Sequence, residues 1–209
     1  SDWSSDVCSS DLVVGEPAPL PISDLEPAAP LEQKRVLLFA GHMIDAPGRK
    51  DPRFPADKEN IAKEKIKEIV VKEINSGAGV ASGFAGGASG GDILFHEVCS
   101  ELGIPTWFYL AIPPSEFVKK SVQEAGPVWV DRFWKIYNAH FSENLVRVLS
   151  EGTDVNDDQE YLPAWLRPKP NYGIWQRNNL WMLFNALHEG CNHRTGDPNI
   201  TLIALWDGA

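Results

Sequence analysis

The fold of this chain is decided by the stretch Gly83-Phe84-Ala85-Gly86-Gly87-Ala88-Ser89-Gly90-Gly91-Asp92. It follows a short apolar run that begins at Val80, and it precedes a segment, Ile93 to Leu102, whose apolar spacing predicts a helix. Glycines let a backbone approach an anion closely, and the free N–H groups of a first helical turn point towards it. This order of strand, turn and helix predicts a phosphate-binding site. The alternative is a surface loop without a ligand, although so many glycines would then cost stability without a reason.

Length and composition bound the class of protein. The chain has 209 residues, of which 43% are hydrophobic, and this predicts one folded domain with a tail. The formal net charge of -10 argues against duplex nucleic acid and against an anionic membrane as partners. No run of about 18 apolar residues is present, so no membrane span is predicted. Cys8, Cys99 and Cys191 do not suggest a disulfide framework, and we expect a cytoplasmic location.

The two ends of the chain differ from its middle. Ser1 to Leu12 resembles, over its whole length, the translation of a common short-read sequencing adapter, which indicates an assembly artefact from environmental DNA. The alternative is a polar tail. Residues 13–33 are rich in proline and alanine and predict an extended linker. We expect residues 34–209 to form the domain, incomplete at its C-terminus because a strand pattern stops there at its own turn.

Strand and helix patterns alternate along the domain, which predicts parallel pairing with right-handed crossovers. We therefore expect a three-layer, Rossmann-like α/β domain with a mostly parallel sheet. Ligands in such sheets bind beyond the carboxyl ends of the strands, here after Ala40, Phe84 and Ile112. The predicted strands are 35–40, 80–84, 106–112, 145–149 and 200–206, and the predicted helices are 57–74, 92–102, 115–124, 128–144 and 172–187.

Polar residues near these strand ends are candidates for ligand contacts. Asp92, at the start of a helix, could accept a hydrogen bond from a ribose hydroxyl or simply cap the helix. Glu97, one helical turn later, is a candidate general base or an ordinary surface glutamate. In an enzyme, Asp92 and Glu97 would be the catalytic residues. The expected ligand-binding set is Gly41, His42, Asp45, Ser82, Gly83, Gly86, Gly87, Ser89, Gly90, Gly91, Asp92, Glu116 and Asn179.

Some of these candidates have equally simple alternatives. His42 and Asp45, near Arg49 and Arg53, could contact phosphate or ribose, or could belong to a solvated loop. The run 177–179, Arg-Asn-Asn, interrupts an apolar helix, so we expect one of its side chains to face the pocket or a buried carbonyl group.

The sequence offers no diagnostic metal site. His96 and Cys99 share a helical face, and Cys191 and His193 lie far along the chain. Zinc could join them, but their spacing is not typical of zinc sites, and core or surface roles are favoured. We expect no metal and no cofactor.

The stretch from Ala85 to Asp92, with His96 four residues later, resembles the SGGARGID-x-x-AH motif of DNA-processing protein A. That protein belongs to the SLOG superfamily, together with the Lonely Guy phosphoribohydrolases. The chain is most similar to bacterial SLOG-type domains associated with TRAFs-binding regions in signalling or conflict proteins. The resemblance covers Arg35 to Gly208 and implies a Rossmann-like fold that binds or processes a nucleotide. It also rests on Gly41-His42, Phe54-Pro55, the run 179–183 and the run 205–208.

The chain departs from these relatives at informative positions. Ser89 stands where the DNA-processing motif has arginine, and Ala85 stands where it has serine. The second Lonely Guy motif, Pro-Gly-Gly-x-Gly-Thr-x-x-Glu with its catalytic glutamate, is absent. These departures favour binding over catalysis and disfavour single-stranded nucleic acid as a partner.

The leading hypothesis is a nucleotide-binding sensor domain whose glycine-rich turn holds the phosphate of a nucleotide or a nucleotide-derived signal. It would transmit occupancy through the linker to fused or neighbouring signalling domains. The second hypothesis is an enzyme that hydrolyses the N-glycosidic bond of a nucleotide, with Asp92 or Glu97 as its carboxylate. The third is a protein-interaction scaffold that binds no ligand. The oligomeric state, including a homo-oligomer, stays open.

Overall fold

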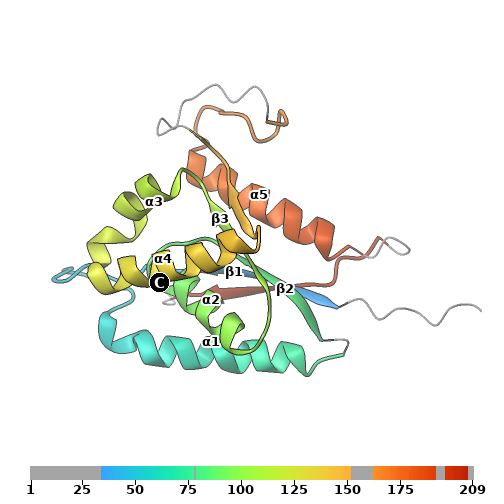
Figure 1. Ribbon diagram of the computed structural model, residues 1–209, viewed down its shortest axis with the longest axis horizontal. Coiled ribbons are helices and arrows are strands. Elements are labelled where there is room, and N and C mark those ends of the chain that lie inside the picture. Colours follow the sequence, from blue (N-terminus) through green and yellow to red (C-terminus); the bar gives the residue numbers. More distant parts are fainter. Residues whose placement is uncertain (1–33, 78, 152–161, 192–195, 207–209) are drawn as a thin grey trace, which may run out of the picture. The chain divides into compact units, whose positions relative to one another are not determined.

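The computed structural model describes residues 34–77, 79–151, 162–191 and 196–206 (Figure 1). The expectations for the adapter-like residues 1–12, the linker 13–33, His193 and the turn after Trp206 lie outside these described residues. In the described part of the chain, no helix combines the length and the apolarity that a membrane crossing needs.

The described strands form one sheet in which every pairing is parallel. The order across the sheet is β4-β3-β2-β1-β5, so β1 lies between β2 and β5. This confirms the predicted α/β, Rossmann-like architecture, and the sheet is wholly parallel rather than mostly so. The strands are β1 (Arg35–Gly41), β2 (Val80–Ala85), β3 (Thr106–Leu110), β4 (Val146–Val148) and β5 (Ile200–Leu205).

Helices cover both faces of the sheet (Figure 1). Along β1, Leu37 and Phe39 pack into the core beneath α1, α2 and α4, whereas Val36 and Leu38 pack with α5 on the opposite face. This alternation is the two-residue period of a strand that is buried on both sides. The helices are α1 (Glu59–Ile74), α2 (Gly91–Glu101), α3 (Pro114–Ser121), α4 (Pro127–Ser142) and α5 (Ile174–Glu189).

The placement of the helices follows from strand order. The chain steps from β1 to β4 in one direction, and right-handed crossovers put the intervening helices on one face. It then returns to the far side of β1, so α5 lies on the other face. The two directions diverge between β1 and β5, and the carboxyl ends of the strands at such a switch point are where α/β sheets bind ligands.

Helix boundaries differ from the predicted ones mainly near prolines and short 3₁₀ turns. The predicted helix 57–74 begins with the 3₁₀ turn Ala56–Lys58 before α1. The predicted helix 115–124 starts at Pro114 and ends at Ser121, followed by a 3₁₀ turn at Gln123–Ala125. Proline suits a first helical position because its missing N–H would have no partner there.

Candidate functional site

The glycine turn, defined here as Gly86–Gly91, joins β2 to α2 and is locked to the loop after β1. Ile44 N donates to Ser89 O at 3.0 Å, and Gly91 N donates to His42 O at 3.1 Å. Gly90 between these bonds has φ +101, and a Cβ there would collide with the backbone of residues 42–44. Glycine at this position therefore allows two ligand-zone loops to pack backbone to backbone.

The glycine turn uses several of its own amides. Ala88 N donates to Asp92 Oδ2 at 3.1 Å, Ser89 N donates to Ser121 O at 3.0 Å, and Gly91 N is bound by the loop after β1. The amides of Gly86, Gly87 and Gly90 take part in no hydrogen bond found among the described residues. Half of the six amides in the glycine turn are therefore already occupied. Fewer amides remain for an anion than the sequence predicts.

A cleft opens beside the glycine turn, on the side of α5. It consists of two cavities, of about 350 Å³ and 450 Å³, whose walls share Gly86, Asp92 and Asn179. Volumes of this size are typical of small-molecule sites. The first cavity is lined by Leu38, Phe39, Ala40, Gly41, Met182, Leu183 and Leu202 besides the shared residues, and the second by Met43, Ala88, Tyr109, Phe117, Lys120, Ser121, Trp175 and Asn178.

Asp92 lies in the wall between the two cavities. Its carboxylate accepts the hydrogen bond from Ala88 N, and it forms no ion pair with a described residue. Burial raises the pKa of Asp92 from 3.8 to about 7, and the Ala88 amide offsets this only in part. Near neutral pH this carboxyl group can therefore donate or accept a proton, and it can bind a ligand hydroxyl in either form.

Two buried polar atoms near the turn have no hydrogen-bond partner in the described structure: Ser89 Oγ and Asn178 Oδ1. Asn178 is 4% exposed and lines the second cavity. Buried polar atoms without partners are uncommon in folded proteins, and of these two residues only Asn178 lines the cleft. The prediction for the polar run in α5 is confirmed, because Arg177 Nη1 donates to the buried Leu166 carbonyl at 2.9 Å and the two asparagines border the cleft.

The second cavity contains residues that the sequence did not single out. Lys120 supplies a cation, and Tyr109, Phe117 and Trp175 supply aromatic walls, with the rings of Phe117 and Trp175 5.5 Å apart. Lys120 lies on α3, directly after the third predicted ligand-zone loop. That position was the available sequence signal. Glu116 and Lys120 are four residues apart on one face of α3, and only the structure shows that Lys120 lines the cavity while Glu116 pairs with Lys119.

Several predicted site residues lie away from the cleft walls. Glu97 is held by Arg132 through two hydrogen bonds of 2.7 Å, on the side of α2 that faces α4 and α1. Glu116 pairs with Lys119 at 2.7 Å. Ion pairs already occupy both carboxylates, and for Glu97 this favours the alternative of an ordinary surface glutamate.

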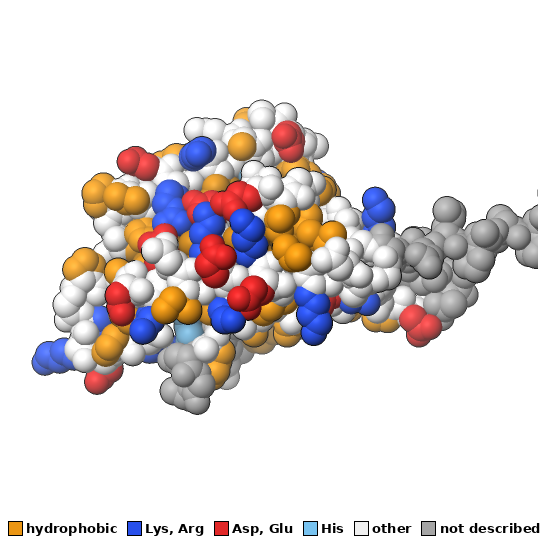
Figure 2. Space-filling view, turned by 90° about the horizontal axis from the view of Figure 1, so that it is seen from below, with side chains coloured by type: hydrophobic (Ala, Val, Ile, Leu, Met, Phe, Trp, Pro, Cys, Tyr) orange, Lys and Arg blue, Asp and Glu red, His pale blue; other side chains and the backbone are white. Residues whose placement is uncertain are grey.

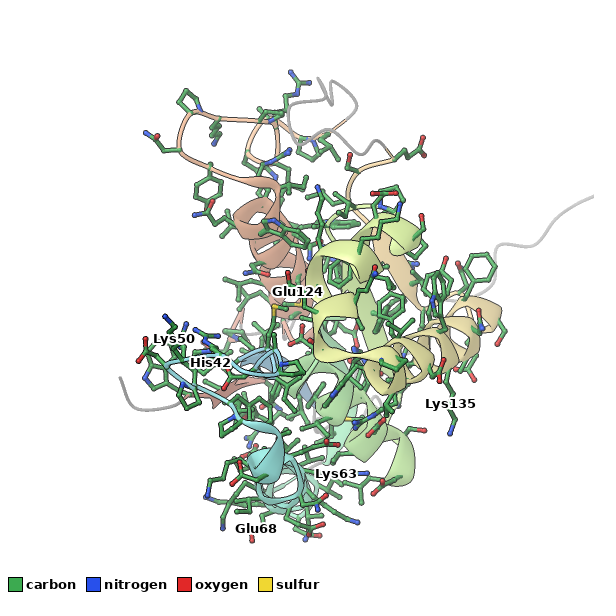
Figure 3. The ribbon with its side chains drawn as sticks, turned by 90° about the vertical axis from the view of Figure 1, so that its left-hand side faces the viewer. His42, Lys50, Lys63, Glu68, Glu124 and Lys135 are labelled. Atoms are coloured by element: carbon green, nitrogen blue, oxygen red, sulfur yellow. The ribbon has the colours of Figure 1, made fainter. Side chains whose placement is uncertain are left out.

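The remaining predicted residues outside the cleft have structural contacts. Asp45 accepts hydrogen bonds from Arg53 N and Phe54 N, both at 2.8 Å, and so closes the loop after β1. Ser82 donates to Glu189. Gly83 and Gly87 lie against the rings of Phe95 and Phe108. His42 lines a different cavity, at the root of the loop that carries Lys50 outward (Figure 3).

Three buried or half-buried polar side chains form a hydrogen-bonded series that ends at the Gly86 carbonyl of the glycine turn. His96 Nε2 lies 2.9 Å from Gly86 O, and His96 Nδ1 lies 2.8 Å from Thr106 Oγ1. Thr106 Oγ1 lies 2.7 Å from His140 Nε2, and His140 Nδ1 lies 2.9 Å from Ile136 O. Carbonyl acceptors end the chain on both sides, so its four contacts require four protons. Two neutral imidazoles and one hydroxyl group supply three.

The pKa values of His96 and His140 are both lowered, which disfavours a fourth proton in this hydrogen-bonded series. Burial, together with the charge of His140, lowers the pKa of His96 to about 3. Burial also lowers the pKa of His140. His96 is therefore a neutral core histidine. Cys99, fully buried on the same helix with its pKa raised to about 12, is an unreactive thiol.

Comparison with known proteins identifies no relative, because no family model, curated protein or solved structure matches the chain. Within the described residues, no group of three or more His, Cys, Asp or Glu side chains is placed to hold a metal ion.

Proposed function

We propose that this domain binds a nucleotide or a nucleotide-derived signal in the cleft between the glycine turn and α5. The observation that carries the proposal is a convergence of groups at the carboxyl ends of parallel strands. Asp92, Asn178 and Gly86 line one cavity; the buried Asn178 oxygen and the Gly86 amide have no hydrogen-bond partner among the described residues. Ligands of parallel α/β sheets bind at this edge, and few sites on such a domain combine these features.

Each part of a nucleotide has a matching group in the cleft. The start of α2 and the Lys120 ammonium group favour a phosphate. The Asp92 carboxyl group suits a ribose hydroxyl, since it has no cationic partner among the described residues. Tyr109 and Trp175 offer aromatic surface to a base.

The resemblance to SLOG domains supports a nucleotide over a nucleic-acid strand. Ser89 stands where the DNA-processing motif has arginine, and it is 1% exposed, with its amide bound to Ser121 O at 3.0 Å. A buried serine cannot supply the exposed positive charge that attracts a phosphate backbone. The net charge of -10 points the same way.

One observation favours a second function, hydrolysis of a nucleotide N-glycosidic bond. A carboxyl group with a pKa of about 7 can protonate the leaving base at neutral pH as the bond between base and sugar breaks. The carboxylate that results can then accept the proton of the water that adds to the sugar carbon. Asp92 is the residue for this step. Glu97 is not proposed for it, because Arg132 holds its carboxylate on another side of α2.

The test is a thermal-shift screen with AMP, ATP, NAD, ADP-ribose and cyclic nucleotides. We expect one of them to raise the melting temperature, and we expect Lys120→Gln to reduce that increase. Lys119→Gln is the matched control, since Lys119 is the adjacent lysine on α3 and pairs with Glu116 outside the cleft. Free base in the same samples, measured by chromatography, separates hydrolysis from binding. A well-folded protein that responds to no compound would contradict the proposal.

A further inference from the structure

A separate cavity, of about 200 Å³, lies on the α1 side of the sheet. Its walls come from the loop after β1, the first turns of α1 and the end of β5, so it lies at the switch point between β1 and β5. The cleft described above lies towards α5 instead, and the two share no lining residue. The lining consists of His42, Arg53, Phe54, Lys58, Ile61, Ala62, Lys65, Leu205 and Trp206.

The charged side chains among the described lining residues are all cationic. They are Arg53, Lys58 and Lys65, and no aspartate or glutamate occurs in that described lining. Elsewhere on this face, Lys and Arg side chains lie among Asp and Glu (Figure 2). Lys58 and Lys65 pair with neighbouring acids at 3.8 Å and 2.6 Å, but exposed pairs of this kind are weak and are readily exchanged for a stronger anion.

An aromatic surface borders these cations. The ring of His42 stacks on Trp206 with centroids 5.0 Å apart and an angle of 29° between the planes. Arg53 Nη2 lies 3.2 Å from His42 Nε2, so the guanidinium group is anchored beside the stacked pair. Trp206 is 63% exposed, and an exposed indole next to cations offers a planar ligand a stacking surface.

We propose that this α1-side cavity binds a small phosphomonoester that carries an aromatic ring. The phosphate group lies between Arg53, Lys58 and Lys65, which can donate charge-assisted hydrogen bonds to it. The ring lies outside the cavity against Trp206. A cavity of about 200 Å³ holds a phosphate group with its linking atoms but not a whole nucleotide.

The experiment follows the indole N–H signals of the full chain by ¹H–¹⁵N NMR. The chain has 8 tryptophans, and Trp206→Phe identifies the Trp206 signal by its disappearance. The probe is phenyl phosphate, with inorganic phosphate and benzyl alcohol as separate arms. We expect phenyl phosphate to shift the Trp206 signal saturably, and to bind more tightly than either arm.

Matched variants locate the binding. Lys58→Gln with Lys65→Gln removes two of the cations, and we expect affinity to fall about ten-fold or more. Lys67→Gln with Lys72→Gln removes two cations of α1 that lie outside the cavity, and we expect affinity within about two-fold of the unaltered chain. Asp92→Asn, in the α5-side cleft, is expected to leave the Trp206 shift unchanged.

Three results would overturn the proposal. They are an unshifted Trp206 signal in folded protein, an equal loss of affinity in the two double-lysine variants, or binding of benzyl alcohol as tight as that of phenyl phosphate. A shift abolished by Asp92→Asn would also overturn it, by assigning the effect to the α5-side cleft. The proposed nucleotide cleft is judged separately, because its test depends on Lys120 rather than on Lys58 and Lys65.

Discussion

The carboxylate of Asp92 and the backbone amide of Ala88 are joined by a hydrogen bond of 3.1 Å that closes the glycine turn from within α2. The same carboxylate forms part of the wall of both cavities of the cleft. One side chain therefore shapes the turn and also presents a titratable group to any ligand there. Its environment provides an amide but no cationic partner among the described residues, so its ionised form is costly.

Asp92→Asn is expected to stabilise the protein at alkaline pH. Folding raises the pKa of Asp92 from 3.8 to about 7, so the folded state disfavours the carboxylate. The free-energy cost of holding Asp92 in the folded state is absent below pH 3.8 and fully present above pH 7. The shift sets an upper limit of about 4 kcal/mol, and solvent in the cleft reduces the expected gain to about 1–2 kcal/mol.

The measurement is urea unfolding of both proteins at pH 5, 6, 7 and 8. The stability difference should grow with pH, and a difference independent of pH would show that the carboxyl group is not perturbed by folding. Asp131→Asn on α4 is the control, and we expect it to show no comparable trend.

Gly90→Ala is expected to destabilise the domain more than Gly126→Ala. Both glycines have similar positive φ values, +101 and +103, so alanine meets similar backbone strain. A Cβ at Gly126 has no heavy atom within 4 Å, whereas at Gly90 it collides with the loop after β1. We expect Gly90→Ala to cost about 2 kcal/mol more, by chemical denaturation. Equal losses would mean that the two loops are not tightly locked.

Glu97→Gln is expected to weaken the fold without affecting ligand binding. The glutamate forms two hydrogen bonds with Arg132, which also contacts Glu59 at 2.7 Å and lies over the Trp129 ring. Loss of this partly buried pair should cost about 1–2 kcal/mol. Glu64→Gln, at an exposed position of α1, is the control. A loss of nucleotide response at unchanged stability would instead indicate that Glu97 belongs to the site.

The domain is expected to lose stability in acid through His96. Its pKa falls from 6.5 to about 3 on folding, so the unfolded chain binds the proton more tightly. Stability present above pH 6.5 is therefore lost as the pH falls towards 3, by up to about 1.4 kcal/mol per pH unit. His96→Gln should flatten the slope measured by urea unfolding, and the exposed His188→Gln should not. Equal slopes in all three proteins would contradict this account.

The sequence predicted the architecture because its signals are local. Apolar runs and helical spacing identify the five described strands and the helices between them, and the glycine run marks the turn after β2. The contacts that arrange the candidate site join residues that are far apart in the sequence. The partner of Ser89 N is Ser121, and the partner of Glu97 is Arg132, 35 residues away. No short-range pattern shows that these contacts exist.

The difference between local and long-range signals also explains which predicted site residues line the cleft and which do not. Asp92 on α2 and Asn179 on α5 line the same two cavities, although they are far apart in the sequence. Only the fold shows that these two helices border one cleft. Glu116 and Lys120 lie one turn apart on α3; Lys120 lines the cleft, whereas Glu116 pairs with Lys119. Sequence position indicated the loop that precedes α3 but could not show which side chain of this helix lines the cleft.

The measurement that tests the central claim most directly is photo-crosslinking with 8-azido-AMP, followed by peptide mapping. A nucleotide in the cleft should label peptides that contain Tyr109 to Ser121 or Ile174 to Glu189, and unmodified AMP should suppress the labelling. Lys119→Gln should retain the label, and Lys120→Gln should reduce it. Labelling that AMP does not suppress, or that falls only outside these segments, would contradict a nucleotide site beside the glycine turn.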